Sequence, residues 1–199
     1  MVIDKEEWKK CQEFERKSWG DQIYLEETNG EVIKQNTYAF HLGLLDNGFP
    51  INLENKKILD VGAGPVSLLL RSENFKKAVA LEPLFYSEEV DLEYSKRGIL
   101  LNRIPAEEMK YKKEFDEIWM YNCLQHVMSP VEILEKIKKA GNFLRIFEWI
   151  NIEPHEGHPH LLTEDFFVEI LNLSPEDYRI EDFNTELLRG KAIIVLKSL

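Results

Sequence analysis

Residues 56–67, Lys-Lys-Ile-Leu-Asp-Val-Gly-Ala-Gly-Pro-Val-Ser, decide the fold of this chain. The apolar start of this stretch is typical of the end of a buried strand, and Gly62 and Gly64 follow it in a tight turn. Pro65 suits the first position of a helix, because its φ is fixed near the helical value. Glycines at a strand-to-helix turn let a ligand approach the backbone closely. We therefore expect a small-molecule site at the carboxyl end of a parallel strand.

The residues around the glycines narrow the class of ligand. A dinucleotide site usually carries a third glycine, in the pattern G-x-G-x-x-G, where this chain has Ser67. Asp60 lies two residues before the first glycine, and its carboxylate would repel a pyrophosphate but suit an ammonium group. S-adenosylmethionine carries an ammonium, a sulfonium and no phosphate, so it fits this pattern better than a dinucleotide does.

A second carboxylate ends the next apolar run. Residues 78–84 are Ala-Val-Ala-Leu-Glu-Pro-Leu, a short strand pattern that ends in Glu82. A carboxylate in this position can accept hydrogen bonds from both hydroxyls of a ribose. NAD sites use the same device, so Glu82 indicates an adenosine-containing ligand without choosing among such ligands.

The order of these motifs resembles that of class I S-adenosylmethionine-dependent methyltransferases. The matching segments are Asp60-x-Gly62-x-Gly64, Glu82, Ala106-Glu107, Phe115-Asp116-Glu117-Ile118 and Tyr121-Asn122-Cys123-Leu124-Gln125-His126-Val127. Each motif is weak alone, whereas the ordered set is fairly specific. The chain is most similar to the small-molecule branch, such as the O-methyltransferases of ubiquinone biosynthesis and the natural-product and sugar methyltransferases. The resemblance covers roughly residues 55 to 172.

The resemblance implies a role for each matching residue. Asp60 would hold the methionine end of the cofactor, Glu107 would lie beside the adenine, and Asn122 would contact the methionine portion. A helix N-cap, an exposed acidic loop and a buried structural amide are the respective alternatives. The full expected cofactor-binding set is Asp60, Gly62, Ala63, Gly64, Glu82, Pro83, Ala106, Glu107 and Asn122.

Histidines are the candidate catalytic residues. His126 follows the fourth predicted strand of the core, where the resembled family often has a histidine near the methyl group. Residues 153–163, Glu-Pro-His-Glu-Gly-His-Pro-His-Leu-Leu-Thr, hold three of the five histidines of the chain. In an extended segment His158 and His160 would share a side, so we expect both to face the same crevice as His126. A histidine base could then take the proton of the acceptor near neutral pH.

Two alternatives remain open for these histidines. One is a structural role, in which they cap, pack or lie in an exposed Pro/Gly loop. The other is a zinc or iron site, because imidazole and carboxylate ligands are both present. We expect metal-free chemistry, because methyl transfer to oxygen or nitrogen needs no metal.

Composition bounds the remaining possibilities. The 199 residues suit one domain. The resemblance implies a helical lid over 1–50 and a cofactor-binding core over 55–199. The net charge of −11 argues against a nucleic-acid substrate, because nucleic-acid binders usually carry a basic surface. Cys11 and Cys123 form no metal or disulfide pattern, and no apolar run is long enough for a signal core or a membrane span. We expect a cytoplasmic protein; its oligomeric state is unknown.

Alternating strand and helix patterns predict an α/β fold, a Rossmann-like, doubly wound, seven-stranded sheet. The last two strands are joined too closely for a parallel crossover, so we expect the last strand to be antiparallel. The expected strands are 57–61, 77–81, 99–102, 116–121, 142–148, 178–183 and 191–197. The expected helices are 4–18, 31–47, 65–73, 86–97, 129–140 and 163–172.

The predicted function is methyl transfer from S-adenosylmethionine to a small molecule, with a hydroxyl oxygen favoured over an amine. A protein that binds the cofactor without catalysis is one alternative. A nicotinamide-dependent oxidoreductase is another, but it would need a turn that tolerates phosphate, and Asp60 and Ser67 argue against such a turn.

Overall fold

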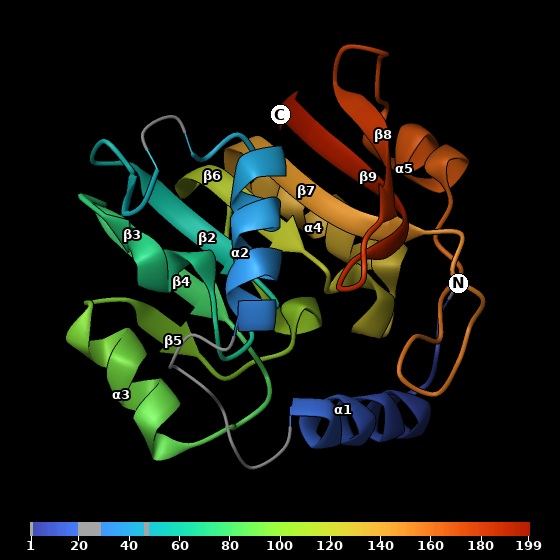
Figure 1. The fold of residues 1–199 in the computed structure, drawn as a ribbon, viewed down its shortest axis with the longest axis horizontal. Coiled ribbons are helices and arrows are strands. Elements are labelled where there is room, and N and C mark those ends of the chain that lie inside the picture. Colours follow the sequence, from blue (N-terminus) through green and yellow to red (C-terminus); the bar gives the residue numbers. More distant parts are fainter. Residues whose placement is uncertain (1, 20–28, 46–47) are drawn as a thin grey trace.

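A computed structural model describes residues 2–19, 29–45 and 48–199 (Figure 1). The strands are β1 Ile51–Asn52, β2 Lys57–Val61, β3 Ser72–Glu73, β4 Lys77–Leu81, β5 Leu100–Asn102, β6 Phe115–Tyr121, β7 Gly141–Ile150, β8 Tyr178–Asn184 and β9 Arg189–Ser198. The α-helices are α1 Lys5–Trp19, α2 Asn29–His41, α3 Glu88–Lys96, α4 Pro130–Ala140 and α5 Glu164–Leu171. Three 3₁₀ turns join them: η1 Leu68–Arg71, η2 Ala106–Glu108 and η3 Leu124–His126.

Seven of the strands form one sheet in the order β5-β4-β2-β6-β7-β9-β8. Neighbouring strands are parallel from β5 through β7, and β9 runs antiparallel to both β7 and β8. The order reverses at β2, since the chain goes outward to β4 and β5 and then returns to β6 on the other side. The predicted doubly wound sheet with an antiparallel last strand is confirmed. Its seven strands begin and end within two residues of the predicted bounds.

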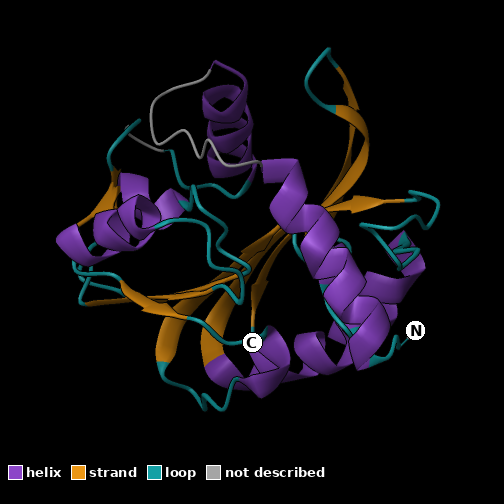
Figure 2. Ribbon diagram, turned by 90° about the horizontal axis from the view of Figure 1, so that it is seen from below, coloured by secondary structure: helices purple, strands orange, loops and turns teal. Residues whose placement is uncertain are grey.

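Helices cover both faces of the sheet (Figure 2). Successive strand residues point to opposite faces, so β2 sends Ile58 toward one buried cluster and Leu59 toward the other. The first cluster includes apolar residues of α2 and α3, and the second includes those of α4 and α5. Asp60 shares the face of Ile58, which places its side chain on the α2 side of the sheet.

One predicted helix is absent. Residues 65–73 form only the single turn η1 and then the strand β3. This turn begins after Ser67, its N-cap, so Pro65 is not the first residue of a helix as predicted. Ser67 Oγ accepts a hydrogen bond from the Leu69 amide, and Ser72 Oγ donates to the Leu68 carbonyl oxygen. Such side-chain bonds satisfy backbone groups that a longer helix would otherwise pair. The chain between Gly64 and β4 is also too short for both a long helix and the strand β3.

The N-terminal part differs in detail from its prediction. The second helix ends at His41 instead of continuing to residue 47, and a two-residue parallel pair, β1 with β3, was not predicted. Residues 20–28 and 46–47 of the expected lid lie outside the described residues. Figure 1 shows α2 across one face of the sheet and α1 beside the loop that follows β7. No helix in the described ranges is both long and apolar enough to cross a membrane.

An ion pair between half-buried Arg145 and buried Glu117 joins the central strands to the residue that follows α2. Arg145 of β7 donates to both carboxylate oxygens of Glu117 of β6, at 2.6 and 3.2 Å, and to the Leu42 carbonyl oxygen at 2.6 Å. Lys56 lies 3.1 Å from the same carboxylate. Burial alone would raise the pKa of Glu117, but the hydrogen bonds and charge of Arg145 outweigh it and lower the pKa to about 2.

We therefore expect Arg145→Leu to lower the free energy of unfolding by about 3 kcal/mol, because it leaves a buried carboxylate with one partner fewer. Lys56 remains, so the loss should lie at the lower end for a broken buried pair. Chemical denaturation at pH 7 would measure it, with Arg189→Leu on the exposed part of β9 as the matched control.

The pH dependence gives a second measure of the same pair. The folded-state pKa of Glu117 lies below the ordinary value of 4.5, so its stabilisation is present above pH 4.5 and is lost as pH falls toward 2. The stability difference between the wild type and Arg145→Leu should shrink over that window. A difference that is negligible at pH 7, or unchanged down to pH 2, would contradict this assignment.

Candidate active site

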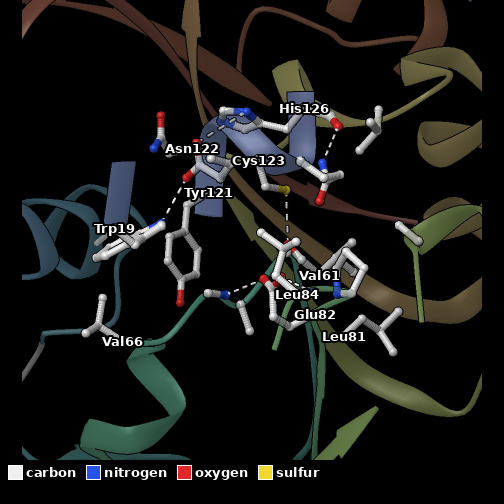
Figure 3. Close-up of a pocket in the computed structure, with 18 of the residues that line it drawn as sticks. Trp19, Val61, Val66, Leu81, Glu82, Leu84, Tyr121, Asn122, Cys123 and His126 are labelled. Carbon is white, nitrogen blue, oxygen red and sulfur yellow. Dashed lines mark hydrogen bonds and ion pairs between the residues drawn. The ribbon is translucent and has the colours of Figure 1, made fainter. Parts of the chain in front are cut away.

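A cavity of about 300 Å³ opens at the carboxyl ends of β2, β4 and β6. This is the edge of the sheet where the strand order reverses, the usual ligand crevice of an open α/β sheet. Figure 3 shows Glu82, which follows β4, and Asn122 and His126, which both follow β6, around this one space. Its wall includes residues from α1, α2, the three strand ends and the turn η2: Trp8, Gln12, Glu15, Trp19, Glu31, Lys34, Gln35, Tyr38, Val61, Gly62, Ala63, Gly64, Glu82, Pro83, Ala106, Glu107, Tyr121, Asn122, Cys123 and His126.

The glycine turn has the geometry that its sequence predicts. Gly62 and Gly64 have φ values of +72° and +62°, in the left-handed region that glycine adopts most easily. The Gly62 amide donates to the Leu81 carbonyl oxygen at 2.9 Å, which ties the turn to the end of β4. A Cβ added at Gly62 would lie 2.4 Å from Cβ of Cys123, so this position also needs glycine for space.

Asp60 lies beneath the turn and not in the cavity wall. Its side chain is fully buried, and Oδ2 accepts hydrogen bonds from the hydroxyls of Ser67 at 2.5 Å and Tyr121 at 2.8 Å. Burial raises the pKa of Asp60 to about 6, although both hydrogen bonds oppose this rise. Tyr121 in turn accepts a hydrogen bond from the Leu68 amide, so the carboxylate links β2, η1 and β6. Asp60 therefore does not line the cavity, and its predicted contact with the methionine end of the cofactor, often made through water in the resembled family, stays a prediction.

Glu82 lines the cavity at the end of β4. Its Oε2 accepts a hydrogen bond from the Gly64 amide and its Oε1 accepts one from the Leu84 amide, each at 2.9 Å. These bonds fix the carboxylate beside the turn, while each oxygen keeps a second lone pair for a ligand. Burial raises the pKa of Glu82 to about 7, so the group titrates near neutral pH.

The other predicted cofactor residues also lie in the cavity wall. Ala63, Pro83 and Ala106 contribute to it, and Asn122 follows β6 with a φ of +52° and an exposed side chain. Glu107 also lines the cavity, but its Oε1 already accepts a hydrogen bond from the Met128 amide at 2.6 Å.

His126 is the one predicted catalytic histidine that lines the cavity. Its Nδ1 lies 2.9 Å from the Gly157 carbonyl oxygen and therefore carries the proton, which leaves Nε2 as the basic nitrogen. Burial lowers the pKa of His126 to about 4, so the ring is neutral near pH 7 and is a weak base.

His158 and His160 lie outside the cavity wall. The His158 ring packs edge-on against His126 with centroids 4.5 Å apart, so the two predicted residues do meet. His160 is buried and its Nε2 bonds to the Val127 carbonyl oxygen at 2.7 Å, which fits the structural alternative. Among the described residues, no group of three or more histidine, cysteine or acidic side chains is arranged to hold a metal ion.

Sequence reasoning missed several residues of the site. Glu148 of β7 is fully buried and its Oε1 accepts hydrogen bonds from the amides of Cys123 and Leu124, which fixes the segment after β6. An acidic residue within the otherwise apolar end of β7 was the available signal. Glu15 and Gln35 line the cavity from α1 and α2, and no motif in the N-terminal segment marks them.

Neither a protein-family model nor a curated protein matches this chain by sequence, whereas solved structures match its fold. NodS, an N-methyltransferase from Bradyrhizobium japonicum in complex with S-adenosyl-L-homocysteine, has a TM-score of 0.63 at 12% identity, covering 95% of this chain and 97% of NodS. The second is the 1,6-didemethyltoxoflavin-N1-methyltransferase of Burkholderia thailandensis, with 1,6-didemethyltoxoflavin and S-adenosylhomocysteine bound. It has a TM-score of 0.62 at 15% identity, covering 100% of this chain and 91% of that enzyme.

Magnesium protoporphyrin IX methyltransferase from Synechocystis PCC 6803, with bound SAM, has a TM-score of 0.60 at 16% identity, covering 94% of this chain and 91% of the enzyme. At such identities the likeness shows the fold alone. The chain has the Rossmann-like fold of class I methyltransferases, and the resemblance inferred from the motif order is confirmed at the level of fold.

The two glycines of the turn offer a matched comparison. Gly64→Ala should cost about 1 kcal/mol, because the added Cβ meets open space and only the left-handed backbone is strained. Gly62→Ala should cost about 1–3 kcal/mol more, because its Cβ also collides with Cys123. Denaturation of both variants would measure the difference. Equal losses of unfolding free energy in the two variants would show that Cys123 does not restrict the side chain at position 62.

Proposed function

We propose that this protein is an S-adenosylmethionine-dependent methyltransferase that acts on a small molecule. The observation that carries the proposal is the Glu82 carboxylate, held by two backbone amides beside the glycine turn and facing the cavity. It is placed to accept the hydroxyls of a ribose, and the turn lets a ligand approach the backbone. The shared fold of the methyltransferases described above supports the same reaction class.

The residues present fit this cofactor. Glu82 would bind the ribose, the wall at Pro83 and Ala106 would contact the adenine, and Gly62 with Asn122 would bind the methionine portion. When bound, the cofactor would supply a methyl group already activated by a positive sulfonium. The chain would align the acceptor with that methyl group and exclude water from it. The side chains of α1 and α2 in the cavity wall would perform both tasks.

Two rival functions are less well supported. A nicotinamide dinucleotide would place its pyrophosphate at a helix N-terminus, but a single 3₁₀ turn with a buried Asp60 beside it follows the glycines here. A non-catalytic binding protein needs no room for an acceptor, whereas this cavity continues past the strand ends to side chains of α1 and α2.

The acceptor is an oxygen or nitrogen that can lose a proton. The motif resemblance favours a hydroxyl, whereas the charges of the cavity favour an amine. The net charge of −11 supports a small molecule over a nucleic acid as the substrate. A cytoplasmic location and a single 199-residue domain remain our proposals.

Calorimetric titration tests the class of cofactor. S-adenosylhomocysteine should bind and NAD should not. Glu82→Gln should lower the affinity at least about tenfold, because it removes a charged acceptor from the ribose. Glu88→Gln on the exposed start of α3 is the matched control and should bind normally. Binding of NAD without binding of the adenosyl ligand would overturn the proposal.

Binding should also depend on pH. The pKa of Glu82 is raised to about 7 in the free protein, and ribose hydroxyls would stabilise its ionised form. The affinity for S-adenosylhomocysteine should therefore rise between pH 6 and pH 8, and the rise should vanish in Glu82→Gln. The same rise in both proteins would assign it to another group.

A further inference from the structure

The wall of the cavity that faces the strand ends is built by α1 and α2. Glu15 and Trp19 come from α1, and Glu31, Lys34, Gln35 and Tyr38 come from α2. The strand ends provide the residues assigned above to the cofactor. Because the acceptor must meet the methyl group from the side that the cofactor does not occupy, this helical wall is where its chemistry would be selected.

Gln35 presents an unsatisfied acceptor in this wall. Its side chain is 7% exposed, and its Oε1 has no hydrogen-bond partner among the described residues. A buried carbonyl oxygen without a partner is costly, so a bound ligand that brings an N–H or O–H donor would be favoured here. A ligand that presents only acceptors would leave this cost in place.

Glu15 adds an acidic group that has no lysine or arginine within ion-pair distance in the part of the chain that the structure describes. Its Oε1 accepts the indole N–H of Trp19 at 2.9 Å, while Oε2 lies 3.7 Å from Nδ1 of His126. His126 directs that proton to the Gly157 carbonyl oxygen and is neutral near pH 7, so it does not balance Glu15. The charge of Lys34 also acts to lower the pKa of Glu15, but the ion pair of Lys34 is with Glu31, at 2.6 Å.

The other charged and aromatic residues of the wall favour a cationic ligand, as Glu15 and Gln35 do. Among the described lining residues, the carboxylates are Glu15, Glu31, Glu82 and Glu107, and Lys34 is the single lysine or arginine. An anionic acceptor would be repelled by this excess, and a neutral alcohol would leave Glu15 uncompensated. The rings of Trp19 and Tyr38 also line the space, and aromatic faces attract cations.

We infer that the methyl acceptor is a small amine that enters as its ammonium form, with Glu15 and Gln35 as the groups that bind it. This inference rests on the proposed function and names the substrate class of the same site. The ammonium would donate one hydrogen bond to the Glu15 carboxylate and another to the Gln35 carbonyl oxygen.

Glu15 also has the chemistry to prepare the amine for attack. Burial raises the pKa of its carboxyl group, which makes it a better proton acceptor. The carboxylate takes one ammonium proton, and the freed lone pair forms the N–C bond while the C–S bond breaks and its electron pair stays on sulfur. The products are a methylated ammonium, neutral thioether S-adenosylhomocysteine and protonated Glu15, which returns its proton to water.

The test is calorimetric titration of the protein saturated with S-adenosylhomocysteine. The probes are 2-phenylethylamine, hexylamine and 1,4-diaminobutane, each with the alcohol of the same carbon skeleton, and 3-phenylpropanoate as an anion. We expect at least one amine to bind at least about tenfold more tightly than its alcohol, and the anion not to bind. Alcohols that bind as tightly as the amines, binding of the anion, or no binding by any amine would overturn the inference.

Variants assign the effect to the named residues. Glu15→Gln should lower amine affinity at least about tenfold, and Gln35→Met should lower it severalfold, with little change for S-adenosylhomocysteine. Glu13→Gln, on the exposed side of α1, is the matched control. Normal amine binding by Glu15→Gln would overturn the inference while the proposed function stands. If the wild type fails to bind S-adenosylhomocysteine, the proposed function itself fails.

Discussion

The buried carboxylate of Asp60 is the group on which the rest of the site depends. It accepts hydroxyl hydrogen bonds from Ser67 and Tyr121, and Tyr121 also accepts the Leu68 amide. A carboxylate in the interior is tolerated only when such bonds compensate its loss of water. The network therefore fixes the turn after β2 against β6. The compensation is incomplete, because Oδ1 of Asp60 has no hydrogen-bond partner among the described residues and burial raises the pKa of the carboxyl group to about 6. The glycine turn has its shape because this support lies below it.

The groups that face the cavity from the strand ends pack against that framework. Glu82 is bonded to the Gly64 amide, and Gly62 packs against Cys123, whose amide is held by Glu148. Strand ends therefore provide rigid groups suited to a cofactor of constant structure. The helices α1 and α2 provide the opposite wall, where Glu15 and other long side chains are suited to discriminate among acceptors. Under the proposed function, cofactor binding and substrate choice would therefore lie on different parts of the fold.

The sequence predicted the strands well, because apolar runs such as 57–61 are buried on both faces and bounded by turns. Gly62 and Glu82 were placed correctly in the cavity, because their positions follow from strand ends and spacing. The directions in which side chains point were harder to predict from the sequence. The Asp60 side chain points away from the cavity and the His160 ring packs inward, because tertiary contacts and not the local sequence pattern decide these orientations. The lining residues of α1 and α2 were missed, since amphipathic spacing does not say what a helix faces.

A crystal structure of the protein with S-adenosylhomocysteine tests the central claim most directly. That claim is that the turn supported by Asp60, together with Glu82, forms the cofactor site. The account predicts both ribose hydroxyls within hydrogen-bond distance of the Glu82 carboxylate, and the homocysteine portion between Gly62 and Asn122. It also predicts that Asp60 keeps its bonds to Ser67 and Tyr121. A ligand bound elsewhere, or a ribose that does not contact Glu82, would contradict the account.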